Sequence, residues 1–211
     1  MNIKLIERKV KKLTLKHKPN GEFVLTVPKG YPKDEIVKFI DMNKEWMEKV
    51  SLKTDYSLIW PEKEGDTFYV FGKPYKVVLK YGSLEPLILG DEIIFYLKDI
   101  NNELDFKKKL HKYIYQKLED RVTPLVYYYL HIMNETINKL SYKHLTAANG
   151  NCYFTRREIN LSDTLIGKKQ EFIEAIIVHE IAHLKHHNHS KDFYNEIYKI
   201  MPDYKLRIKG K

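Results

Sequence analysis

Over the first hundred residues, apolar and polar positions alternate in short segments, which is the pattern of β-strands with one solvated face. Phe23, Leu25 and Val27 alternate after a looser segment at 3–17, and Pro19-Asn20-Gly21 between the two predicts a hairpin turn. Two further strand pairs are predicted at 67–71 with 75–79 and at 87–89 with 93–97. We therefore expect mainly antiparallel sheet in this part of the chain.

Elsewhere the apolar spacing changes to that of helices. Residues 32–50 place apolar side chains three and four apart, with two acidic residues in the first turn, which predicts one amphipathic helix. The same spacing runs over 104–134, where we expect Pro124 to kink or divide the helix. Short strands are expected near 136–142, 152–154 and 159–161, followed by helices that start near 168 and 191.

These elements predict an α+β protein. Its N-terminal part would consist of antiparallel hairpins with one helix, and the rest would be a helical core with a short antiparallel sheet. A chain of 211 residues suffices for one large domain or two small ones. We expect two subdomains, 1–100 and 101–211, packed as one compact unit.

Ionisable side chains interrupt the apolar run of the helix that starts near 168. His179 and His183 are four residues apart, so both imidazoles lie on one helix face and can bind one metal ion. Glu180 lies slightly to the side, where it can reach a metal-bound water. This His-Glu-x-x-His spacing is that of zinc hydrolases, in which one helical turn supplies two ligands and a general base. It predicts a Zn²⁺ site with Glu180 as the general acid/base.

A third ligand is needed, and our prediction is His189. It follows His183 by six residues, so it can return to the metal only if the helix ends first. We expect a sharp turn at Asn188 and Ser190 as the N-cap of the next helix. The fourth coordination position is then left for water. The alternative ligands are His186 and His187, which we place near the end of the helix, Glu196 and Cys152.

The charge balance suggests acidic partners. Lys and Arg number 37 against 28 Asp and Glu, and the formal net charge is +9. Such a surface attracts nucleic acid, although Lys outnumbers Arg, the commoner choice for base and phosphate contacts. The basic residues gather in three patches: Lys4, Arg8, Lys9, Lys11, Lys12, Lys16 and Lys18; Lys107, Lys108, Lys109 and Lys112; Lys205, Arg207, Lys209 and Lys211.

Three features bear on where the protein works. The chain has no run of about 18 apolar residues, so we expect no membrane span. The first ten residues carry charges throughout, unlike a secretory signal. Cys152 is the only cysteine and cannot form an internal disulfide. Together they favour the cytoplasm, and no pattern indicates an oligomeric state.

The stretch HEIAHLKHHNHSKDFY, from His179 to Tyr194, resembles the signature of the YgjP-like metallopeptidase domain family, which is related to SprT-like proteases and the wider zincins. The resemblance implies a zincin-like core, His179, His183 and His189 as zinc ligands, and Glu180 as the catalytic acid/base. It covers nearly the whole chain, through Arg8 to Pro28, Lys44-Glu45-Trp46, Phe71-Gly72-Lys73-Pro74-Tyr75 and Met201-Pro202-Asp203-Tyr204. Where the family usually has Trp-Gly-Ser-Cys, this chain has Asn149-Gly150-Asn151-Cys152.

Two hypotheses of function follow. The first is a zinc metallopeptidase that hydrolyses protein or peptide substrates through a metal-activated water, with Glu180 as general acid/base. The second is a basic, nucleic-acid-associated protein whose zinc is mainly structural, which requires a fourth protein ligand such as His186 or Cys152. The two merge in a protease acting on DNA-bound proteins, an activity to which SprT-like relatives are linked.

Overall fold

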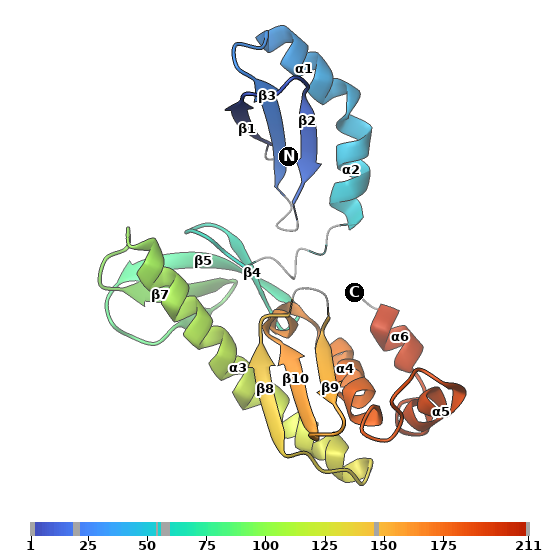
Figure 1. Cartoon of the computed structure of the whole chain (residues 1–211). Helices are drawn as coiled ribbons and strands as arrows, with labels where there is room; N and C mark the ends of the chain where they lie inside the picture. Colours follow the sequence, from blue (N-terminus) through green and yellow to red (C-terminus); the bar gives the residue numbers. More distant parts are fainter. Residues whose placement is uncertain (1–2, 19–21, 54, 56–59, 146–147, 210–211) are drawn as a thin grey trace. The chain divides into compact units, whose positions relative to one another are not determined.

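The chain divides into two compact units, Met1–Ile59 and Trp60–Lys211. The computed structural model describes residues 3–18, 22–53, 55, 60–145 and 148–209 (Figure 1). Both units mix helices with small sheets, in agreement with the α+β class predicted from the sequence. The boundary lies after residue 59, whereas the sequence suggested a division at residue 100.

The first unit is a three-stranded sheet with two helices. Its strands are β1 (Ile3–Arg8), β2 (Thr14–His17) and β3 (Phe23–Pro28), in the order β1-β3-β2. The pairing of β2 with β3 is antiparallel, as expected, but β1 runs parallel to β3. The predicted turn Pro19-Asn20-Gly21 lies outside the described residues. Leu25, Val27 and Ile36 form the small core of this unit.

The single helix predicted at 32–50 is two helices. They are α1 (Lys33–Met42) and α2 (Lys44–Lys53), and they are separated at Asn43. The side-chain amide of Asn43 donates a hydrogen bond to the Phe39 carbonyl at 2.7 Å, and its backbone N–H is directed to the carbonyls of Asp41 and Ile40. Asn competes for backbone groups in this way, which favours helix ends over helix interiors.

The second unit begins with a four-stranded sheet. Its strands are β4 (Thr67–Val70), β5 (Lys73–Tyr81), β6 (Leu87–Leu89) and β7 (Glu92–Leu97), in the order β4-β5-β7-β6. The predicted antiparallel pairs β4–β5 and β6–β7 are confirmed, whereas β5 and β7 pair in parallel. The β4–β5 turn uses Phe71 and Gly72 at φ of 49° and 82°, a conformation that suits glycine at the second position.

A long helix, α3 (Glu103–Ile132), leads from this sheet to the next. Asn102 caps it by accepting a hydrogen bond from the Asp105 backbone N–H at 3.1 Å. Pro124 lies inside a continuous helix, so the expected division does not occur. The second sheet comprises β8 (Lys139–Lys143), β9 (Gly150–Tyr153) and β10 (Glu158–Ser162), with β10 central, parallel to β8 and antiparallel to β9.

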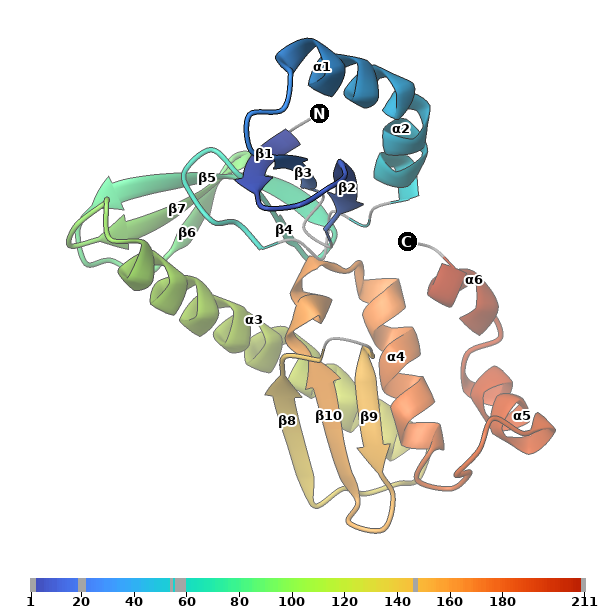
Figure 2. The same ribbon diagram turned by 45° about the horizontal axis from the view of Figure 1, so that its top comes forward.

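The chain then forms a short 3-10 helix, η2 (Asp163–Gly167), and three α-helices, α4 (Gln170–Ala182), α5 (Lys191–Ile200) and α6 (Tyr204–Lys209). In both views α3 runs behind the β8–β10 sheet, and α4 lies beside β9 (Figures 1 and 2). One apolar core joins Phe95 on β7, Ile114 on α3, Ile159 on β10 and Val178 on α4. Because β4, β5 and β7 share this core, their sheet belongs with the following helices, and the chain divides at 59 instead of 100.

Candidate metal centre

The helix α4 carries His179 and Glu180 through the core of the second unit. Its apolar residues are buried on all sides, from Phe172 to Ala182. His183 is the C-cap residue, so the helix ends about five residues earlier than the sequence suggested. His186 and His187, which we expected on the helix, follow it instead. The backbone bends at Asn188, as predicted, although this residue is not among those with positive φ.

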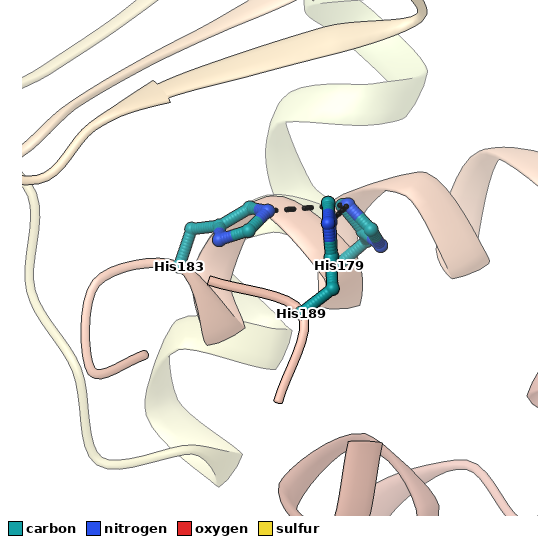
Figure 3. A group of neighbouring side chains, drawn as sticks. All are labelled: His179, His183 and His189. Carbon is teal, nitrogen blue, oxygen red and sulfur yellow. Dashed lines mark hydrogen bonds between the residues drawn. The ribbon is translucent and has the colours of Figure 1, made fainter. Parts of the chain in front are cut away.

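Three imidazoles converge beyond the end of this helix. The Nε2 atom of His179 lies 3.3 Å from that of His183 and 3.1 Å from that of His189 (Figure 3). One ligand atom from each of the three residues lies within 4.8 Å of the others. Zn–N bonds of about 2.0–2.1 Å in a tetrahedral site place ligand nitrogens about 3.3 Å apart. The two distances from His179 Nε2 therefore fit ligands of a single zinc ion.

His189 reaches this position because a second helix starts directly after it. Ser190 is the N-cap of α5 and accepts a hydrogen bond from the Phe193 backbone N–H at 3.4 Å, as predicted. The Phe193 side chain is fully buried, and its ring centroid lies 5.0, 4.6 and 4.9 Å from those of His179, His183 and His189. The α5 helix thus holds the loop that carries His189 against the end of α4.

The Nδ1 atoms of two of these histidines have partners that orient the rings. His183 Nδ1 lies 3.0 Å from the His186 carbonyl oxygen, which can only accept, so Nδ1 carries the proton and Nε2 keeps a lone pair. His179 Nδ1 lies 2.7 Å from the Tyr204 hydroxyl on α6. Partners of this kind fix the tautomer of a metal-binding histidine. The sequence offered only the Met-Pro-Asp-Tyr likeness to the family as a sign of Tyr204.

The electrostatics of the cluster favour neutral imidazoles. Burial, with a smaller contribution from His183 and His189, lowers the pKa of His179 to about 4. Burial also lowers the pKa of His183. Neutral imidazole is the form that binds metal, so the site is ready for a cation near neutral pH.

Glu180 lies in the apolar interior beside the edge of the second sheet. Its side chain is buried, and burial raises its pKa to about 7. A Cβ added to Gly150 on β9 would lie 2.7 Å from Cγ and Oε1 of Glu180, so the strand backbone packs directly on the carboxylate. A carboxyl group with a pKa near neutrality can both accept and donate a proton at physiological pH.

Two of the alternative ligands, His187 and Glu196, have partners elsewhere. The His187 ring stacks on Phe154 at 3.6 Å between centroids. The carboxylate of Glu196 pairs with Lys185 at 3.0 Å and with Lys199 at 3.4 Å, which holds its pKa below the usual range. Burial, followed by the charge of Glu180, raises the pKa of the Cys152 thiol to about 12. In the part of the chain that the structure describes, the metal-capable group contains the three histidines and no fourth side chain.

Three nitrogen donors beside a buried carboxylate are the arrangement of metal-dependent hydrolases that keep one coordination position open. The family model of the YgjP-like metallopeptidase domain matches residues 11–209. The chain therefore belongs to the YgjP-like metallopeptidase family, as the sequence resemblance implied, and it is a metallopeptidase.

Two solved structures resemble part of this chain. The metallopeptidase zymogen abylysin of Pyrococcus abyssi superposes with a TM-score of 0.39 at 24% identity, covering 42% of this chain and 89% of abylysin. The metallopeptidase zymogen jannalysin of Methanocaldococcus jannaschii gives a TM-score of 0.37 at 22% identity, covering 42% of this chain and 94% of jannalysin. No curated protein matches the chain. Within the described residues, no helix is both long and apolar enough to cross a membrane.

Proposed function

We propose that the protein is a zinc-dependent peptidase in which His179, His183 and His189 hold the metal and Glu180 is the general acid/base. The observation that carries this proposal is that His179 Nε2 lies 3.1 Å from His189 Nε2 and 3.3 Å from His183 Nε2, close to the spacing of tetrahedral zinc ligands. The group has three members within the described residues, which supports a site with a free position for water over a closed structural site.

When bound at such a site, zinc lowers the pKa of a coordinated water and polarises the carbonyl to be attacked. Glu180 takes a proton from the attacking water and returns it to the leaving amine nitrogen. In the metal-free protein, burial raises the pKa of this carboxyl group to about 7, and the charge of a nearby metal ion would lower it again. Glu180 follows His179 directly on α4, so one turn of the helix carries both the proposed base and a proposed ligand.

Two neighbouring histidines provide the test of this proposal. His189→Ala removes a proposed ligand, and His187→Ala removes another exposed imidazole, which stacks on Phe154. We expect the wild type and His187→Ala to bind zinc and cleave an unstructured protein, with activity lost to a chelator and restored by zinc. His189→Ala should bind zinc at least 10-fold more weakly and lose the cleavage. Equal zinc affinity of the two variants would refute the ligand set.

A second candidate function is the binding of single-stranded nucleic acid, and a groove in the second unit favours it. The groove measures about 850 Å³ and lies between the β4–β5 hairpin, β6 and α3. Lys73, Lys117 and Arg121 line it, with Asp120 as the single carboxylate among its lining residues. Arg121 lies over the Phe71 ring at 4.5 Å and Lys117 over the Tyr113 ring at 5.5 Å. Cations interleaved with aromatic rings suit phosphates and bases.

The basic patches themselves are weaker candidates, because some of their charges are neutralised. In the middle patch, Lys112 pairs with Glu85 at 2.6 Å, and in the last patch Arg207 pairs with Asp203 at 2.9 Å. Fluorescence anisotropy of a labelled single-stranded oligonucleotide measures the binding affinity of variants, and so distinguishes binding in the groove from binding to the middle basic patch. We expect Lys117→Glu to weaken binding several-fold more than Lys107→Glu, which changes an exposed residue of the same helix. Equal losses would leave only a non-specific basic surface, and no binding would remove this function.

A further inference from the structure

The helix α6 is fastened to α4 close to the proposed metal site. Arg207 on α6 donates a hydrogen bond from Nη1 to Oε2 of Glu174 on α4 at 2.6 Å. Tyr129 on α3 donates its hydroxyl proton to the same Glu174 oxygen at 3.1 Å. Glu174 precedes His179 by five residues on α4, so this anchor lies little more than one helical turn from the histidine. The position of α6 is thereby fixed relative to the His179 side chain.

The anchored helix presents one buried side chain to the cluster. Tyr204 is 6% exposed, its ring is nearly parallel to that of His179 with an interplanar angle of 16°, and its hydroxyl lies 2.7 Å from His179 Nδ1. For His179 to offer Nε2 to a metal, its Nδ1 must carry the proton. The phenolic oxygen is then the acceptor of that N–H.

We propose that Tyr204 is a positioning residue for the metal site. Its hydroxyl accepts a hydrogen bond from the Nδ1–H of His179, which leaves the lone pair on Nε2. The same bond holds the imidazole ring at the angle that turns Nε2 to the side where the Nε2 atoms of His183 and His189 lie. This inference rests on the proposed function, because it requires His179 to be a ligand. In contrast to the His183 partner, which is a backbone carbonyl supplied by the turn itself, the His179 partner comes from a separate helix. Packing of α6 on α4 thus becomes a condition for tight metal binding.

A neighbouring tyrosine provides a matched control. Tyr198 on α5 packs edge-on against Tyr204, with ring centroids 6.3 Å apart. Among the residues that the structure describes, its buried hydroxyl has no hydrogen-bond partner. Tyr198→Phe and Tyr204→Phe therefore remove the same atom from adjoining rings and keep both rings in the packing. Only Tyr204→Phe removes a hydrogen bond to the cluster.

The experiment measures zinc dissociation constants by competition with a chromophoric chelator for the full-length wild type and the two variants. Thermal unfolding of each metal-free protein is measured alongside, to show that the fold is retained. We expect Tyr204→Phe to bind zinc about 10–100-fold more weakly than the wild type, the usual effect of losing such a partner. Tyr198→Phe should match the wild type.

Two results would overturn the inference. Wild-type affinity in Tyr204→Phe would show that the hydroxyl has no positioning role. Equal weakening in both variants would assign the effect to aromatic packing instead of the hydrogen bond. If the wild type itself binds no zinc, the proposed function fails first, and the failure is then distinguishable from loss in Tyr204→Phe alone.

Discussion

The Cα of Gly150 faces the Glu180 side chain so closely that an added Cβ would lie 2.7 Å from both Cγ and Oε1 of the carboxylate side chain. Gly150 is on β9, which pairs with the central strand β10. Glu180 is on α4, which packs against β9. The absent Cβ leaves room for the Glu180 side chain.

Gly150→Ala should therefore displace the carboxylate without removing a proposed metal ligand. A misplacement of about 1 Å can reduce turnover about 100-fold. We expect kcat to fall by about 10–100-fold while the zinc dissociation constant changes less than threefold. Steady-state kinetics on an unstructured protein and chelator competition measure the two quantities. Unchanged kcat would show that the close approach has no bearing on the chemistry.

Phe193 packs against all three histidines, so its substitution should affect both the fold and the metal. We expect Phe193→Leu to lower the free energy of unfolding by about 1–2 kcal/mol and to weaken zinc binding several-fold. Phe95→Leu is the control, because Phe95 is equally buried in the same unit but packs on Phe106 and Tyr113. It should lose similar stability and keep wild-type zinc affinity. Loss of zinc affinity in both variants would contradict a local role of Phe193.

The buried Glu180 should make the stability of the metal-free protein depend on pH. Its pKa is raised from 4.5 to about 7, so between these values the folded form holds a proton that the unfolded form has released. The carboxyl group thus stabilises the fold less as pH rises through this window. Gln at this position does not ionise. We therefore compare the free energy of unfolding of Glu180→Gln with that of the wild type. The excess of the variant over the wild type should grow from near zero at pH 4.5 to about 3 kcal/mol at pH 8.

Urea unfolding of both metal-free proteins at pH 4.5, 6 and 8 measures this gain. A difference that stays constant with pH would contradict the raised pKa. With zinc bound, the nearby cation favours the charged carboxylate, so the pH dependence should shrink.

The features of the site that depend on residues close together in the sequence could be predicted, whereas contacts between residues far apart in the sequence could not. The spacing of His179 and His183 places them together on any helix, and Ser190 caps the next helix through its own hydroxyl. We predicted that the helix would continue to a turn at Asn188 and that this turn would bring His189 back to the metal. Instead, α4 ends at Ala182, and the His183 ring then donates a hydrogen bond to the His186 carbonyl. The spatial position of His189 agrees with the prediction, and its role as a ligand remains a prediction.

Tyr204 and the parallel strand pairs show why the rest could not be predicted. Tyr204 lies 25 residues from His179, and no periodicity links the two positions. Alternation of apolar residues is the same for a parallel and an antiparallel partner, so β1–β3, β5–β7 and β8–β10 could not be recognised as parallel. The sheet of residues 67–97 could not be assigned to the second unit from the sequence. The buried residues of β4, β5 and β7 are apolar, and this pattern does not reveal which helix they contact.

The most direct test of the account compares the wild type with Glu180→Gln, each loaded with zinc and assayed for metal content and for cleavage of an unstructured protein. Because Gln keeps the size of the side chain but cannot exchange a proton, we expect about one zinc per chain in both proteins. Turnover should fall by about 100- to 10,000-fold in the variant, the usual contribution of general acid–base catalysis. Cleavage by Glu180→Gln at the wild-type rate would contradict the central role assigned to this carboxylate.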